Sequence, residues 1–164
     1  YIAKKAFELR IEKKVPPFLL IVEEAHNFAK EKEREQISKG IIEKIAREGR
    51  KFGACLCLIS QRPIHLSTTA LSQCNTHIIM RVTNPYDLKH IAESCEGIDR
   101  ESLDALTTLR VGEALIVGEA VNHPVFVKVR KRKSKALEGK DLREMIEEFL
   151  VEEEKRLQDA SAFL

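Results

Sequence analysis

The stretch Phe18-Leu-Leu-Ile-Val-Glu-Glu-Ala-His-Asn27 decides the fold of this chain. Its first five residues are all apolar and run directly into two carboxylates, Glu23 and Glu24. Such a run is typical of a strand buried on both faces of a parallel sheet, and acids at its end lie where open α/β folds bind ligands. One carboxylate can hold Mg²⁺, directly or through water, while the other orients or deprotonates an attacking water, as in a Walker B strand. The alternative is a core strand that ends in a solvated acidic turn.

The composition indicates one domain, or part of one. The 164 residues are 43% apolar, which is enough for a core, and the net charge of +2 excludes a wholly basic nucleic-acid binder. No apolar stretch approaches the roughly 18 residues of a membrane span, so no membrane association is expected. Cys74 and His77 have a C-x-x-H spacing, but the second such pair that a zinc site needs is absent, so no cysteine metal site is expected. The cytosol is the compartment that this cysteine usage favours.

Apolar runs and helical periodicities alternate along the chain. They predict strands at 18–22, 54–60, 76–82, 113–117 and 125–129, and helices at 2–13, 37–46, 67–74, 84–96, 99–108 and 141–158. This order predicts an α/β fold with a mostly parallel sheet flanked by helices and a C-terminal β-hairpin and helix. Residues 131–164 are expected to be a basic linker and a charged helix.

Two further motifs follow the acidic pair. Arg47 and Arg50 stand near the end of the helix before the second strand, where a guanidinium group could reach a phosphate across a subunit boundary as an arginine finger. The alternative is a cationic helix end that complements the helix dipole. Gln61 follows the second strand, where its amide, both donor and acceptor, can sense a phosphate or a water. The alternative there is a polar cap to the strand.

The sequence also contains a basic tract and lacks a common motif. The tract from Lys128 to Lys135 holds six cations in eight residues and could contact nucleic-acid phosphates, although charge runs are often solvated linkers. None of the seven glycines belongs to a G-x-x-x-x-G-K-[ST] phosphate loop. If this chain belongs to an ATPase, its phosphate loop is therefore expected upstream of Tyr1.

Four motifs in this order carry a family resemblance. They are Leu-Ile-Val-Glu-Glu-Ala-His, Arg-Glu-Gly-Arg-Lys-Phe-Gly, Ile-Ser-Gln-Arg-Pro and Leu-Arg-Val-Gly-Glu-Ala-Leu-Ile-Val-Gly. Together they resemble the HerA family of archaeal and bacterial DNA translocases, within the HerA/FtsK group. The resemblance covers roughly residues 17–130. It implies that residues 1–130 are the C-terminal part of a RecA-like P-loop NTPase core that works as a homo-hexamer around double-stranded DNA. It also implies ATP and Mg²⁺ as cofactors, and a NurA nuclease as partner in DNA-end processing and double-strand break repair.

The resemblance also implies roles for individual residues. Glu24 matches the catalytic glutamate, and Glu23 takes the place of the usual Walker B aspartate, a change that lengthens the side chain that would face Mg²⁺. Arg47 and Arg50 match the trans-acting arginines, without indicating which is the finger. Gln61 matches the sensor of the Ser-Gln-Arg-Pro motif, in which Arg62 is expected to contact nucleotide. His123, with the basic tract, is expected to approach the nucleotide of an adjacent subunit.

Two other interpretations remain open from the residues alone. The first is a ring ATPase of the VirB4 type used in conjugation or secretion, which shares the Walker B and sensor strands. The second is a non-catalytic module that docks on DNA or on a partner. The presence of Glu24, Arg47 and Arg50 argues against the second. Without a phosphate loop, however, these 164 residues alone are expected to show no ATP turnover.

Overall fold

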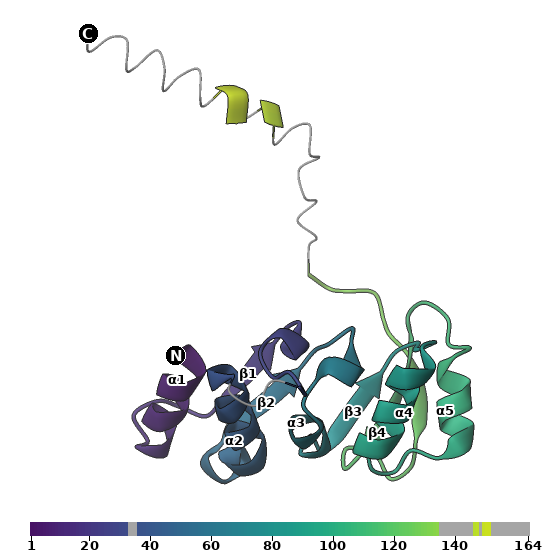
Figure 1. Ribbon diagram of the computed structural model, residues 1–164, viewed down its shortest axis with the longest axis horizontal. Helices are drawn as coiled ribbons and strands as arrows, with labels where there is room; N and C mark the ends of the chain where they lie inside the picture. The colour runs from purple at the N-terminus through teal and green to yellow at the C-terminus, as the bar shows by residue number, and fades with distance from the viewer. Residues whose placement is uncertain (33–35, 135–145, 148, 152–164) are drawn as a thin grey trace. The chain divides into compact units, whose positions relative to one another are not determined.

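The described residues form five short strands and a set of helices in the computed structural model (Figure 1). It describes residues 1–32, 36–134, 146–147 and 149–151. The elements are α1 (Ile2–Ile11), β1 (Phe18–Val22), η1 (Ala25–Asn27), α2 (Ile37–Phe52), β2 (Ala54–Leu58), η2 (Pro63–His65), α3 (Thr68–Ser72), β3 (Thr76–Ile79), α4 (Pro85–Ser94), α5 (Arg100–Leu106), β4 (Glu113–Gly118) and β5 (Val125–Lys128). Side chains of Ser67, Asn84 and Asp99 cap the helices α3, α4 and α5, as the sequence predicted.

The first two strands form the expected parallel pair. β1 and β2 are in register from Phe18 opposite Ala54 to Val22 opposite Leu58, and α2 makes the crossover between them. α2 is capped at its C-terminal end by Gly53, whose φ of 71° lies in the left-handed region that glycine adopts without steric cost. The backbone turns there directly into β2. The carboxyl ends of β1 and β2 therefore lie at the same edge of the sheet.

The third strand pairs differently from the simple alternation expected from the sequence. β3 runs antiparallel to β4, and β4 runs antiparallel to β5, so the described strands form a parallel pair and a three-stranded antiparallel sheet. β3 also ends at Ile79, earlier than predicted. Val82, which was expected in this strand, donates its N–H to the Leu106 carbonyl instead (3.3 Å). The α/β class is confirmed, but the third strand, β3, pairs with β4 of the C-terminal hairpin.

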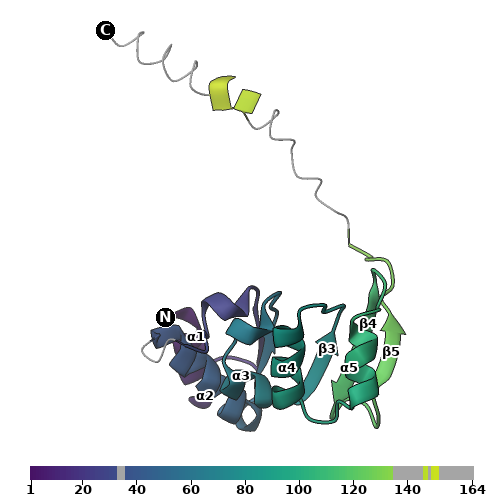
Figure 2. The same ribbon diagram turned by 45° about the vertical axis from the view of Figure 1, so that its right-hand side comes forward.

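The helices build the core against one side of the strands (Figures 1 and 2). Leu115 and Val117 of β4 are fully buried and belong to one apolar cluster with Ile91 of α4 and Leu106 of α5. Smaller clusters join β1 and β2 to the helices α1, α2 and α3. The opposite side is less covered, since large apolar side chains of β1 and β3 are exposed: Leu19 (57%), Ile21 (56%) and Ile78 (67%). An apolar sheet surface of this kind is typical of a contact face.

The chain divides into two compact units, Tyr1–Arg130 and Lys131–Leu164. Most of the predicted C-terminal helix, 141–158, lies outside the described residues, but 146–147 and 149–151 within it are helical. Among the described residues, none of the helices is both long and apolar enough to span a membrane.

Candidate functional site at the carboxyl edge of the parallel strands

Backbone hydrogen bonds extend the pairing of β1 and β2 past the ends of both strands. The Ile59 N–H donates to the Val22 carbonyl (2.9 Å), and the Ala25 N–H donates to the Ile59 carbonyl (2.9 Å). Ala25 is fully buried, so this junction is anchored in the core. The acidic pair and the Ser-Gln-Arg motif, which are far apart in sequence, are therefore held side by side.

The Glu24 carboxylate is in contact with Gln61, and both residues follow strands that end at this edge. The Gln61 Nε2 donates to Glu24 Oε1 at 2.9 Å. Glu24 has φ 48° and ψ 45°, a left-handed conformation that a non-glycine residue adopts at a cost of about 1 kcal/mol. The buried Ala25 that follows holds this turn in place. A carboxylate and an amide thus meet at the carboxyl edge of the parallel pair, where open α/β folds bind ligands.

A histidine that the sequence reasoning did not assign to the site completes the cluster. His26 Nδ1 lies 2.9 Å from Ser60 Oγ and 3.4 Å from Glu24 Oε2. The Arg62 N–H donates to the same Ser60 oxygen at 3.1 Å. The Glu24-x-His26 spacing was visible in the sequence, but only the 3-10 turn η1 brings the imidazole back toward the carboxylate.

Glu23 is exposed beside this cluster and is the carboxylate expected to face Mg²⁺. Within the described residues, no group of three or more His, Cys, Asp or Glu side chains could hold a metal ion by itself. Mg²⁺ commonly takes only one or two protein carboxylates, and completes its shell with waters and substrate phosphates. The exposed Glu23 carboxylate fits this mode of Mg²⁺ binding. A single carboxylate is too few ligands for a metal site made of protein groups alone.

Arg47 belongs to a polar network on α2. Its Nη1 lies 3.8 Å from Glu43 Oε2, and Glu43 Oε1 accepts a 2.6 Å hydrogen bond from the buried Ser67 hydroxyl. Lys39 lies 4.0 Å from the same carboxylate. Glu43 was not singled out from the sequence, although the Lys39–Glu43–Arg47 spacing of four residues was a readable signal. The network orients Arg47, whose side chain remains 46% exposed.

Arg50 lies one helical turn further along α2. It is 82% exposed and its Nη1 lies 3.6 Å from Glu119 Oε2. In the part of the chain that the structure describes, no hydrogen bond or ion pair joins Arg47 or Arg50 to Glu24 or Gln61. The arginines and the carboxylate site are therefore not brought together by contacts within one chain.

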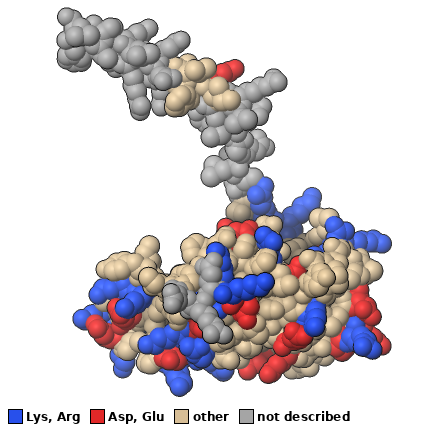
Figure 3. Space-filling model, viewed as in Figure 1, with Lys and Arg blue, Asp and Glu red and all other residues tan. Residues whose placement is uncertain are grey.

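The two remaining candidate residues are both exposed. Arg62 directly follows Gln61, and its side chain is at the surface. His123 lies in the connection between β4 and β5, and the structure does not bring it into contact with the cluster around Glu24. On the face shown in Figure 3, Lys and Arg side chains are interspersed with Asp and Glu, in keeping with the small net charge.

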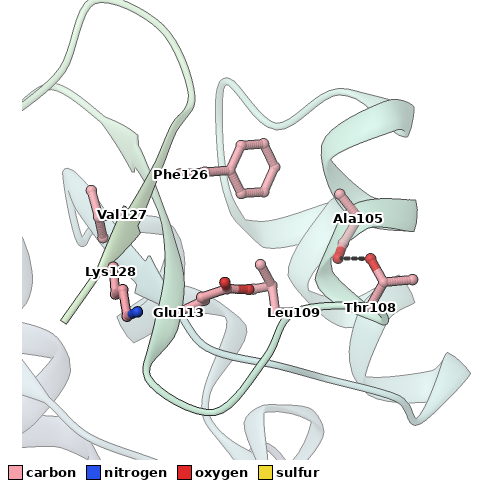
Figure 4. Close-up of a pocket in the computed structure, with 7 residues that line it drawn as sticks. All are labelled: Ala105, Thr108, Leu109, Glu113, Phe126, Val127 and Lys128. Atoms are coloured by element: carbon pink, nitrogen blue, oxygen red, sulfur yellow. Dashed lines mark hydrogen bonds between the residues drawn. The ribbon is translucent and has the colours of Figure 1, made fainter.

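A cavity of about 500 Å³ lies between α5 and the β4–β5 hairpin (Figure 4). Its lining is Ala105, Thr108, Leu109, Glu113, Phe126, Val127 and Lys128. The Thr108 hydroxyl in this lining is already bonded to the Ala105 carbonyl at 2.9 Å, and the Glu113 carboxylate to the Arg110 N–H at 2.8 Å. None of the predicted site residues lines this cavity, so we place the candidate site at the edge of β1 and β2.

Solved structures with a similar fold include a genome packaging NTPase and VirB4. The genome packaging NTPase B204 of Sulfolobus turreted icosahedral virus 2, in complex with ATP-gammaS, matches 79% of this chain and 62% of its own length, with a TM-score of 0.64 and 21% identity. VirB4 of Thermoanaerobacter pseudethanolicus matches 80% of this chain and 36% of its own, with a TM-score of 0.63 and 17% identity. The fold is thus that of the P-loop NTPases, as the motifs indicated, although no family model matches the chain.

Sequence relatives define the family more narrowly. The DNA double-strand break repair helicase HerA of Pyrococcus furiosus is 44% identical over 123 residues, and that of Sulfolobus acidocaldarius is 39% identical over 125. These matches cover 73% and 76% of this chain. The chain belongs to the HerA family, as its motifs indicated. It spans only 22% and 25% of the length of these two relatives.

Proposed function

We propose that this chain is part of the motor of an ATP-driven DNA helicase or translocase that acts in double-strand break repair. The observation that carries the proposal is the 2.9 Å hydrogen bond between Gln61 and Glu24 at the carboxyl edge of two parallel strands. This contact supports a role for Glu24 as general base and for Gln61 as a phosphate-sensing amide that act on the same substrate group. The HerA helicases among the relatives support DNA as the substrate of the full-length protein.

In this mechanism Glu24 accepts a proton from the attacking water, and Gln61 holds the water or the phosphate by hydrogen bonding. Arg47 or Arg50 offsets developing phosphate charge from a neighbouring subunit, because neither contacts Glu24 in its own chain. Glu23 would hold Mg²⁺ together with the substrate phosphates, and the ion would neutralise phosphate charge there. Arg62 and His123, which are both exposed, are the further nucleotide contacts in this proposal, His123 toward the nucleotide of an adjacent subunit.

The proposal extends to the assembly and its setting. A trans-acting arginine requires a neighbouring subunit, and the family resemblance extends this inference to a homo-hexamer around double-stranded DNA. A NurA-type nuclease is the proposed partner in DNA-end processing, and the cytoplasm is the proposed location. Likeness to VirB4 rests on fold alone at 17% identity, so it favours no conjugation or secretion role.

The test uses the full-length protein and DNA-stimulated ATP hydrolysis. Glu24→Gln should stop turnover while ATP binding persists, because the amide cannot accept the proton. Arg47→Ala and Arg50→Ala are compared with Lys44→Ala, an exposed cation on the same helix, which should keep wild-type turnover.

Mixing Glu24→Gln with the inactive arginine variant separates action in cis from action in trans. A complete site forms where a subunit that retains Glu24 meets one that retains the arginine, so the mixture should regain part of the activity. Wild-type hydrolysis by Glu24→Gln would overturn the proposal. Absence of recovery in the mixture would overturn the trans role of the arginine.

A further inference from the structure

We propose that His26 is a positioning residue that holds the Glu24 carboxylate and links it to the end of β2 through Ser60. The inference rests on the proposed function, because it assigns to His26 a role that acts through Glu24. One ring nitrogen, Nδ1, lies between two oxygens, 2.9 Å from Ser60 Oγ and 3.4 Å from Glu24 Oε2. The three residues come from the ends of two different strands.

The imidazole is placed by a rigid turn. Glu24 is held in the left-handed region at φ 48°, and Ala25 is fully buried and bonded to the Ile59 carbonyl at 2.9 Å. The His26 side chain is only 14% exposed. Because the backbone on its N-terminal side is fixed, the ring has little freedom to leave the two oxygens.

The Glu24 carboxylate has a neighbour at each of its oxygens. Gln61 donates to Oε1 at 2.9 Å, and His26 Nδ1 lies 3.4 Å from Oε2. The Gln61 amide can leave Oε1 when it turns to a phosphate or a water. His26 then remains as the second contact, so the carboxylate keeps its direction while Gln61 moves. A carboxylate with one partner alone would rotate about its terminal bond.

Ser60 ties this second contact to the same segment that carries Gln61. Its Oγ accepts a hydrogen bond from the Arg62 N–H at 3.1 Å. The same oxygen lies 2.9 Å from His26 Nδ1. The nearby Glu24 Oε2 favours the tautomer with a proton on His26 Nδ1, because a lone pair on Nδ1 would be repelled by the carboxylate oxygen. An N–H at Nδ1 can donate to Ser60 Oγ or to Glu24 Oε2. The end of β2 therefore contacts Glu24 twice, directly through Gln61 and indirectly through Ser60 and His26.

The experiment measures kcat and KM for ATP in the full-length protein with DNA present. His26→Ala should lower kcat by about ten- to 100-fold, because a small displacement of the base is costly, and should leave the KM for ATP unchanged. His26→Asn places an amide N–H near the position of Nδ1 and should restore most of the loss. His65→Ala, a histidine of η2 outside the cluster, is the matched control and should keep wild-type kcat.

A double-mutant cycle tests the link to Ser60. Ser60→Ala should lower kcat less than His26→Ala does, and adding it to His26→Ala should cause no further loss, because both act through one contact. Failure of His26→Asn to restore kcat, or full additivity of the two changes, would show a merely structural role and overturn the proposal. If His26→Ala does not fold, His26→Asn and Ser60→Ala decide by the same criteria.

Glu24→Gln in the same assay separates the positioning role of His26 from the proposed function. If Glu24→Gln is inactive while His26→Ala matches wild type, the positioning role fails and the proposed function stands. If Glu24→Gln is fully active, the proposed function fails and the positioning role fails with it.

Discussion

Ser67 carries two structural tasks with a single hydroxyl group. The side chain is 1% exposed, accepts from the Ala70 N–H at the start of α3, and donates to Glu43 Oε1 at 2.6 Å. Ser67→Ala removes the helix cap and leaves the partly buried carboxylate with one donor fewer. We expect it to lower the free energy of unfolding by about 1–2 kcal/mol, measured by urea denaturation.

Ser72 on the same helix provides the control for this prediction. It is exposed, and its hydroxyl donates only to the Thr69 carbonyl at 3.2 Å. Ser72→Ala should change the free energy of unfolding by no more than about 0.5 kcal/mol. Equal effects of the two serine substitutions would contradict the assigned role of Ser67.

His77 predicts a pH dependence of stability. It is 9% exposed, and burial lowers the pKa of its imidazole below the usual 6.5, although a hydrogen bond with the Cys74 backbone acts the other way. The unfolded chain therefore takes up this proton at a higher pH than the folded chain does. Stability should rise as the pH rises from the lowered pKa to about 6.5, and the contribution is complete above it.

Urea denaturation between pH 5 and 8 measures this effect. His77→Gln removes the titrating group, so the dependence of unfolding free energy on pH should be flatter than in the wild type. A slope unchanged by the substitution would show that other groups cause the pH dependence.

At the scale of elements, α2 contains two glycines whose substitution should have opposite effects. A Cβ at Gly40 would meet no atom within 4 Å, whereas a Cβ at the buried Gly49 would collide with the Ala54 carbonyl oxygen of β2. At Gly49 the helix α2 and the strand β2 approach too closely for a side chain to fit. The absence of a Cβ there allows α2 to lie against β2.

Gly40→Ala should therefore stabilise the protein by about 0.5–1 kcal/mol through the helix preference of alanine. Gly49→Ala should destabilise it by about 1–3 kcal/mol through overpacking. Thermal unfolding of both variants gives the comparison, with the same substitution on the same helix. A stabilising Gly49→Ala would contradict the described contact between α2 and β2.

At the scale of the whole molecule, the chain carries the proposed base, sensor and arginines, but its sequence has no phosphate loop motif. Nothing in it matches the backbone cradle that binds the β- and γ-phosphates. We expect the purified 164-residue chain to show no ATP turnover, while the full-length protein hydrolyses ATP under the same conditions. A steady-state phosphate-release assay makes the measurement. Turnover by the 164-residue chain that Glu24→Ala abolishes would contradict this expectation.

Local signals in the sequence were sufficient for most elements. The apolar runs at Phe18 and Ala54 became a parallel pair, and the capping residues before α3, α4 and α5 were read correctly because a cap depends on neighbours a few residues away. The meeting of Glu24 with Gln61 was also predictable, because parallel strands end at one edge.

Tertiary structure decided what depends on partners far along the chain. The third strand joined the hairpin because strand pairing is set by which edges meet in space, and strand periodicity carries no such information. The tie of Arg47 to Glu43 and Ser67, and the approach of His26 to Glu24 and Ser60, depend on side-chain directions that a left-handed turn and a crossover helix impose. The sequence alone thus determined the class of fold and the family, through local patterning and motif order, and packing determined which side chains support the site.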